Sequence, residues 1–160
     1  MTEIRDEIVV DCSSAEAASH LQRLFESPSA QGPDGAVLTL RVPVGDATLE
    51  RDVVAKLTPR KAEPGFRTMD LTWGPKGGGP YPVFDGTLVL DGLSATTSKL
   101  AVVGRYGPPG GLAGAAFDAV LGKRIATASL KALLEVFKTT IETARTASAS
   151  SAAQYLATYE

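Results

Sequence analysis

Residues 107–144 read GPPGGLAGAAFDAVLGKRIATASLKALLEVFKTTIETA, and this stretch decides the fold that the rest of the chain is expected to adopt. Apolar residues recur in it at the 3.6-residue period of an α-helix. They are Leu112, Ala116, Ala119, Ala126, Leu130, Leu133, Phe137 and Ile141. The prolines and glycines of residues 107–111 suit a change from extended chain to a first helical turn. A helix of roughly 50 Å cannot bury such a stripe alone, so it needs a sheet to pack against.

The same stretch carries two features that a simple amphipathic helix would not have. Lys123 falls on the apolar stripe, either as a side chain at the edge of the covered area that reaches water or as a cation at the rim of a pocket. A second apolar stripe lies nearly opposite the first. It could pack on a short helix, on the C-terminal tail or on a second subunit, which would make a homodimer. Its members are Phe117, Leu121, Ile125, Ala132 and Val136.

Upstream of this helix, the chain is expected to form about six antiparallel strands. Residues 4–12 alternate between apolar and polar, as in a first strand, and Ser13 and Ser14 then precede a short helix over residues 15–26. Five more alternating segments follow, joined by short turns without helical crossovers, which predicts antiparallel pairing. They are centred on residues 38–43, 49–57, 69–73, 84–90 and 100–106. The predicted class is α+β, in which a strongly curved antiparallel sheet wraps around a long C-terminal helix.

Composition restricts the classes of function. A chain of 160 residues with 44% hydrophobic and 21% charged residues fits a single domain, predicted over residues 1–145, followed by a Ser/Ala-rich tail over residues 146–160 that is either a linker or a docked helix. A net charge of -2 gives no reason to expect nucleic acid as a partner. The sequence contains no run of about 18 apolar residues, so it predicts no membrane span. A single cysteine and an N-terminus without an apolar signal run favour the cytoplasm.

The sequence lacks the usual catalytic and cofactor-binding motifs. His20 is the only histidine, and with Cys12 it supplies fewer ligands than a metal site needs, so we expect a surface histidine, no metal and no cofactor. The glycine-rich loops at residues 74–80 and 107–114 lack the phosphate-binding and dinucleotide-binding patterns. Turn formation is the better explanation of both loops.

The candidate ligand-binding residues come from the apolar face of the predicted sheet. Trp73, Phe84 and Tyr106 lie on it by alternation, Tyr81 comes just before the fifth strand, and Arg51 interrupts an otherwise apolar series. Aromatic walls with one inward cation would suit an apolar ligand that carries an acid or carbonyl group. The other interpretation is that the aromatic residues are core and that a neighbouring acid such as Glu50 or Asp52 satisfies Arg51.

The order of these elements resembles the START-like, or SRPBCC, helix-grip superfamily with its Bet v 1-like fold, which includes bacterial polyketide cyclase-like proteins. The features that carry the resemblance are the first strand leading into a helix after Asp11, the five-strand meander, and the segment from Leu100 to Leu134 with its GRYGPPG sequence at residues 104–110. The resemblance covers nearly the whole chain. It implies a cavity between the sheet and the long helix and the binding of lipids, polyketides or other hydrophobic molecules.

Three functions are therefore open at this stage. The first is binding, transport or sensing of a small hydrophobic ligand, with Arg51 and Lys123 at its polar end and Trp73, Tyr81, Phe84, Tyr106 and Phe117 as walls. The second is a polyketide cyclase or dehydratase, with Tyr106 as general acid and Arg51 stabilising an enolate. The third is a protein-interaction module whose cavity is filled by its own side chains.

Overall fold

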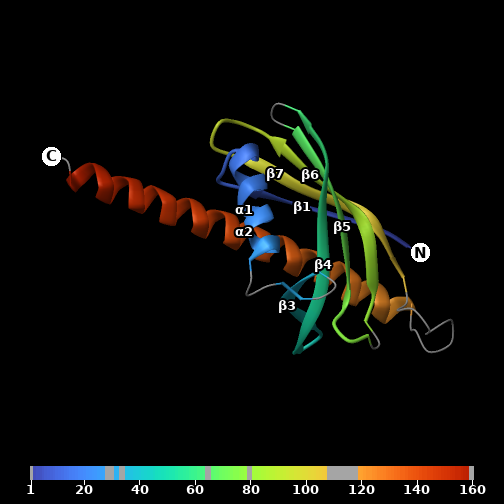
Figure 1. Ribbon diagram of the computed structural model, residues 1–160. Coiled ribbons are helices and arrows are strands. Elements are labelled where there is room, and N and C mark those ends of the chain that lie inside the picture. Colours follow the sequence, from blue (N-terminus) through green and yellow to red (C-terminus); the bar gives the residue numbers. More distant parts are fainter. Residues whose placement is uncertain are drawn as a thin grey trace.

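The computed structural model describes residues 2–27, 31–32, 35–63, 66–78, 81–107 and 119–158. Within these ranges the chain forms strands and two helices that enclose one core (Figure 1). In chain order the elements are β1 (Thr2–Val10), α1 (Ser14–Glu26), β2 (Gln31–Gly32), β3 (Gly35–Val44), β4 (Ala47–Glu63), β5 (Phe66–Pro75), β6 (Val83–Gly92), β7 (Ser98–Gly107) and α2 (Ala119–Thr158).

The strands form a single sheet in the order β1-β7-β6-β5-β4-β3-β2. Every neighbouring pair is antiparallel, because each connection from β2 to β7 is short and the first strand returns to pair with the last. The predicted α+β helix grip is confirmed. The difference is β2, a two-residue strand that pairs with the start of β3 in a segment expected to be a break.

Glycine occupies the left-handed positions in two turns of the meander. Gly45 has a φ of 61° in the two-residue connection between β3 and β4. Gly77 and Gly78 have φ values of 75° and 79° in the loop after β5. Side chains rarely tolerate this left-handed region, so the glycine-rich loop at residues 74–80 is explained by turn geometry in the part that is described.

Helix α1 starts where the sequence predicts. Ser13 is its N-cap, and Ser13 Oγ accepts a hydrogen bond from the Glu16 backbone N at 3.3 Å. The inner side of α1 is buried at Ala17, Ala18 and Leu21. Its aromatic residue Phe25 packs edge-on against Phe137 of α2, with ring centroids 6.0 Å apart.

Helix α2 crosses the concave side of the sheet and contacts both edge regions, β1 and β3, as well as α1 (Figure 1). Its predicted inward stripe is buried from Ala126 onward, through Leu130, Leu133, Phe137 and Ile141. The predicted positions Leu112 and Ala116 lie outside the described residues.

The C-terminal tail belongs to this same helix. Residues 146–158 continue α2 without a break, and Figure 1 shows this end of the helix extending past the sheet. The expected linker is therefore an extension of α2. The predicted domain boundary at residue 145 and the role of the tail stay predictions.

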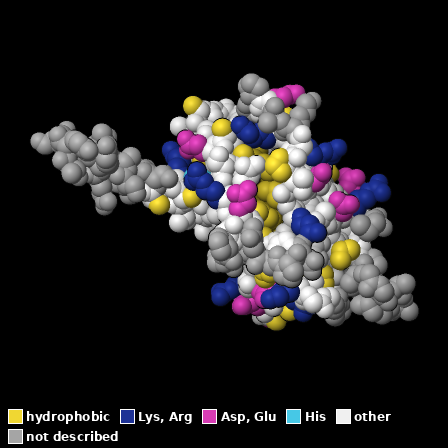
Figure 2. Space-filling view, in the orientation of Figure 1, with side chains coloured by type: hydrophobic (Ala, Val, Ile, Leu, Met, Phe, Trp, Pro, Cys, Tyr) yellow, Lys and Arg dark blue, Asp and Glu magenta, His cyan; other side chains and the backbone are white. Residues whose placement is uncertain are grey.

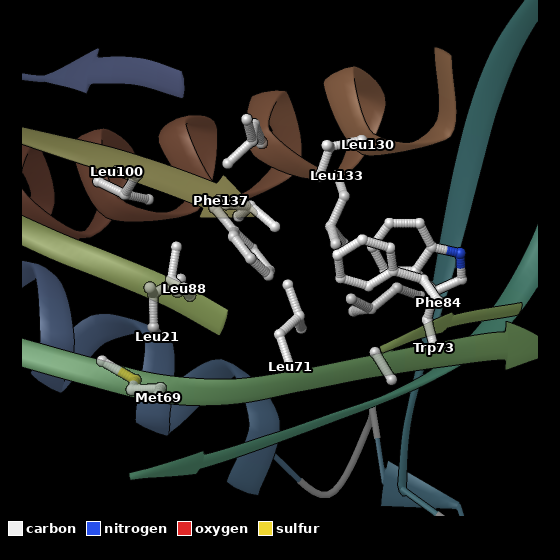
Figure 3. Packing of buried hydrophobic residues seen from close by; sticks show 14 of the residues in the cluster. Leu21, Met69, Leu71, Trp73, Phe84, Leu88, Leu100, Leu130, Leu133 and Phe137 are labelled. Atoms are coloured by element: carbon white, nitrogen blue, oxygen red, sulfur yellow. The ribbon is translucent and has the colours of Figure 1, made fainter. Parts of the chain in front are cut away.

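The core lies between the concave face of the sheet and α2 (Figure 3). Leu71, Leu88 and Leu100 project from three strands toward Leu133 and Phe137 of α2. All five side chains are fully buried, so they supply the apolar contact that holds α2 against the sheet.

Charges of both signs are interspersed on the face that Figure 2 shows, around a narrow strip of hydrophobic side chains. This face therefore carries no large field of one sign. Among the described helices, none has a stretch apolar and long enough to cross a bilayer.

Candidate functional site

Three aromatic side chains form a row across the inner face of the sheet. Trp73 of β5 lies opposite Phe84 of β6, and Phe84 lies opposite Tyr106 of β7. Their exposed fractions are 3%, 2% and 4%. Trp73 and Phe84 are stacked, with ring centroids 4.1 Å apart and planes inclined by 12° (Figure 3). We call Trp73, Phe84 and Tyr106 the aromatic row. The predicted inward position of all three is confirmed.

Two facing glycines make room for the row. Gly86 and Gly104 pair directly across β6 and β7, on the inner side where Phe84 also points. A Cβ atom would lie 2.7 Å from Phe84 Cζ at Gly86 and 2.5 Å from it at Gly104. The Phe84 ring therefore occupies the space that side chains at these positions would need. A glycine inside a strand often marks such a close approach of another group.

Tyr81 ties the segment before β6 to α2. Its side chain is 2% exposed, and its hydroxyl forms a hydrogen bond with Ser129 Oγ. Ser129 Oγ in turn donates to the Ile125 carbonyl at 2.6 Å, so the Tyr81 hydroxyl is the donor to Ser129. Burial raises the pKa of Tyr81, against smaller lowering effects of Ser129 and Arg51, and this keeps the phenol protonated.

Arg51 is half-buried at the same end of the interior. Its Nη2 atom donates to the Gly78 carbonyl at 2.6 Å, and its Cζ atom lies 6.0 Å from the centroid of the Tyr81 ring. The neighbouring acids have other partners: Asp52 accepts a hydrogen bond from the Thr39 hydroxyl at 2.6 Å, and Glu50 lies 3.6 Å from Arg41. Within the described residues, Arg51 is bound to the Gly78 carbonyl and not to Glu50 or Asp52, the acids considered as its partners.

Two buried N–H groups of this region have no acceptor among the described residues. They are Arg51 Nε and Trp73 Nε1. Arg51 shares the inner face of β4 with Val53 and Ala55, and Ala55 lies opposite Trp73 in the sheet. Buried N–H groups in folded proteins almost always have a partner, so two on one face of the sheet mark this region as chemically unusual.

One hollow lies beside Arg51 and another lies beside α2. The first, of about 360 Å³, is lined by Glu50, Asp52 and Lys76 as well as Arg51. The other, of about 680 Å³, is a groove between α2 and β3, with Ala128, Ala132 and Val136 of α2 on its apolar side. Ala132 and Val136 belong to the second apolar stripe, so the groove occupies part of the helix surface whose partner was left open.

The remaining predicted residues are placed differently. Lys123 is exposed, because it lies one turn before the buried part of the stripe and its side chain reaches water. Phe117 lies outside the described residues. Ser129 was not predicted, although its place on the inward stripe between Ala126 and Leu130 was readable, because a single hydroxyl in such a stripe carries no signal of its partner.

His20 corrects another expectation. It is only 8% exposed and is not a surface histidine. Ligand atoms of His20, Cys12 and Glu16 lie within 4.8 Å of one another, which makes them the group of potential metal ligands in the described part of the chain. The sequence analysis considered two of these residues and did not include the carboxylate between them.

Comparison of the sequence with protein-family models and with curated proteins gives no match. Solved structures do match. An aromatase/cyclase from Streptomyces is 11% identical with a TM-score of 0.54, and the match covers 90% of this chain and 93% of that one. A START superfamily protein from Mycobacterium smegmatis is 14% identical with a TM-score of 0.51, covering 88% and 97% of the two chains. A conserved protein from Geobacillus kaustophilus is 16% identical with a TM-score of 0.51, covering 89% and 93%.

Likeness at such low identity speaks for the fold alone. The matches nevertheless extend over nearly all of each chain, and they agree with the element order, the antiparallel sheet and the crossing of α2. This chain therefore has the START-like helix-grip fold.

Proposed function

We propose that this chain binds a small hydrophobic ligand that carries a carbonyl or carboxylate group, such as a lipid or a polyketide, between the sheet and α2. The observation that carries the proposal is the pair of buried N–H groups, Arg51 Nε and Trp73 Nε1, without an acceptor among the described residues. A buried donor left without an acceptor costs about 1–3 kcal/mol. A ligand oxygen would remove this cost and gain a hydrogen bond.

The surroundings of these donors suit the two ends of such a ligand. The aromatic row supplies buried apolar surface for the body of the ligand, and the Arg51 guanidinium supplies a positive charge for its polar end. The hollow beside Arg51 opens to solvent between charged side chains, which favours the polar end on that side. Tyr81 completes the wall next to Arg51, whereas the exposed Lys123 could act only at the rim.

The only tryptophan of the chain is Trp73, so its fluorescence reports on this site directly. We expect decanoate to change the emission in a saturable way and to bind more tightly than decanol, which lacks the negative charge. Arg51→Met should weaken decanoate binding by about 10- to 100-fold, since hydrogen bonds to charged groups contribute about 1.5–3 kcal/mol. The same substitution should change decanol binding much less.

Arg60→Met is the matched control. Arg60 lies on the same strand, exposed, and its Nη1 atom is 3.4 Å from Asp70 Oδ1. The Arg60→Met variant should bind decanoate with the affinity of the unchanged protein. Equal decanoate affinity in Arg51→Met and Arg60→Met would contradict the role of Arg51. Native mass spectrometry of the protein from its own host would identify a co-purifying molecule and give the oligomeric state in one measurement.

A second candidate is a cyclase or dehydratase that acts on a polyketide in the same place. The observations that support it are the similar fold of the Streptomyces aromatase/cyclase and the buried phenol of Tyr106 in the aromatic row. Tyr106 would be the general acid, and Arg51 would stabilise an enolate. Loss of turnover of a poly-β-ketone in Tyr106→Phe, with the Trp73 response to the substrate retained, would favour the enzyme over the binder.

A third candidate is an interaction module. It is supported by the side chains that fill the part of the interior in Figure 3 and by the groove of about 680 Å³ between α2 and β3. If neither decanoate nor decanol changes Trp73 emission and the native protein carries no small molecule, this candidate would replace the first.

A further inference from the structure

Three side chains with different ligand atoms meet on one side of α1. The Cys12 thiol, the Glu16 carboxylate and the His20 imidazole each place a ligand atom within 4.8 Å of the other two. Cys12 Sγ lies 3.6 Å from Glu16 Oε2 and donates its proton to that carboxylate. Cys12 is fully buried, His20 is 8% exposed, and Glu16 is exposed to solvent.

The backbone explains why residues spaced four apart converge. Positions i and i+4 lie on one face of a helix, and helical side chains lean toward the N-terminus. His20 therefore leans back over Glu16. Cys12 lies just before the Ser13 N-cap, and Glu16 reaches it past the start of the helix. Two contacts fix the start of this series: the Ser13 cap, and the Ser98 hydroxyl, which donates to the Cys12 carbonyl at 2.8 Å.

We propose that Cys12, Glu16 and His20 form a binding site for a divalent transition-metal ion of the zinc class. Zinc accepts sulfur, nitrogen and carboxylate oxygen ligands, and three protein ligands leave the fourth tetrahedral position to water. The ligand atoms of a tetrahedral zinc site lie about 3.5 Å apart, so small side-chain rotations from the present arrangement would close the site. The exposed Glu16 side gives the ion and its water access to solvent.

Charge and proton balance are consistent with a cation at this place. Bound as a thiolate and a carboxylate, Cys12 and Glu16 would neutralise the two positive charges of the ion, with neutral His20 as the third ligand. The thiol proton that now lies toward Glu16 leaves to solvent when the sulfur–metal bond forms. Arg145 is a positive group that lowers the pKa of Cys12, against the larger raising effect of burial. Its Nη1 atom donates a hydrogen bond to the Asp11 carbonyl at 2.7 Å.

This site is separate from the proposed ligand site. Cys12 follows Val10, which pairs with Ser98 at the start of β7, whereas Tyr106 of the aromatic row lies at the other end of that strand. At about 3.3 Å per residue, Ser98 and Tyr106 are on the order of 26 Å apart along β7. Success or failure of the metal proposal is therefore independent of the hydrophobic-ligand proposal.

Cobalt(II) titration of the full chain, stripped with a chelator, tests the site. The chain contains one cysteine and one histidine, so a thiolate-to-cobalt charge-transfer band can arise within one molecule only from Cys12. We expect that band to saturate at one equivalent, to disappear when Zn²⁺ is added, and to be lost in Cys12→Ser. One proton per ion should appear in solution. His20→Gln and Glu16→Gln should weaken Co²⁺ binding by about 10-fold or more, since even the loss of a group that only orients a metal ligand typically costs about 10- to 100-fold.

Glu26→Gln is the matched control, because Glu26 is an exposed carboxylate on the same helix outside the cluster. It should bind Co²⁺ as the unchanged protein does. Glu16→Gln changes an exposed side chain and should fold, which circular dichroism checks. Absence of the thiolate band in the unchanged protein would overturn the proposal. So would affinity that is unchanged in both Glu16→Gln and His20→Gln, or a band that appears only when the protein dimerises.

Discussion

At the scale of single residues, the clearest perturbation is that of the Cys12 thiol. Its side chain is fully buried beside the Glu16 carboxylate. Burial first, and then the negative charge and hydrogen-bond acceptance of Glu16, raise the pKa of Cys12 to about 11. The folded chain consequently holds the thiol proton more tightly than the unfolded chain does.

A dependence of stability on alkaline pH follows from this thiol. Well below pH 9 the thiol is protonated in both states, so it adds no pH dependence to the free energy of unfolding. Between the ordinary pKa of 9.0 and about 11, the thiol has lost its proton mainly in the unfolded chain. Because the unfolded state then binds fewer protons, the free energy of unfolding falls as pH rises through this window. Cys12→Ser should show a shallower fall in urea denaturation measured over the window without added metal. Parallel curves for the two proteins would contradict the assignment, since all other groups titrate in both.

At the scale of elements, the facing glycines decide how closely β6 and β7 pack with the aromatic row. Gly86 and Gly104 lie opposite each other, and the Phe84 ring fills the space above them while it stacks on Trp73. Three strands thus depend on the absence of two side chains. The same device positions Trp73, whose indole N–H carries part of the proposed ligand binding.

Gly104→Ala tests this packing. The new Cβ would lie 2.5 Å from Phe84 Cζ and 2.6 Å from the Gly86 Cα atom, so ring and backbone must both move. Overpacking of this kind costs about 1–3 kcal/mol of unfolding free energy. Gly74→Ala is the matched control within a strand, because its Cβ would meet Val83 Cγ1 at an ordinary 3.5 Å. Chemical denaturation should rank the control as the more stable protein, and the reverse order would refute the explanation.

At the scale of the whole molecule, the two proposed sites lie toward opposite ends of β7. The metal site lies near the pairing of Val10 with Ser98, whereas the ligand site extends from Tyr106 on β7 across β6 and β5 to Arg51 on β4. Helix α2 runs past both, since it contacts α1 as well as the sheet and forms the Ser129 bond to Tyr81. Helix α2 therefore contacts both regions, although the side chains of the two sites lie far apart.

Substitutions at sites so far apart should act independently. Cys12→Ser should leave the affinity of decanoate, measured by Trp73 emission, within about 2-fold of its original value. Saturating Zn²⁺ should have an equally small effect in the unchanged protein. A change of 10-fold or more would show that α2 or the β1–β7 edge transmits a rearrangement between the two ends.

Sequence periodicity was sufficient for the elements other than β2 and the C-terminal end of α2, and for the inner face of the sheet and of α2. The period of two placed Trp73, Phe84 and Tyr106 on the inner face, and the period of 3.6 placed Leu130, Leu133 and Phe137 on the inner side of α2. These patterns arise from backbone geometry, so they are local properties that the chain carries in its order of residues.

Only the tertiary structure decided which of these residues meet and which polar groups lack a partner. Register across β5, β6 and β7 brings the aromatic row into line, packing of α2 brings Ser129 to Tyr81, and α1 brings Glu16 between Cys12 and His20. It also decided that Lys123 reaches water and that α2 continues to Thr158. A residue order sets the direction of a side chain relative to its own strand or helix, whereas burial and pairing depend on the elements that pack beside it, and these are distant in the sequence.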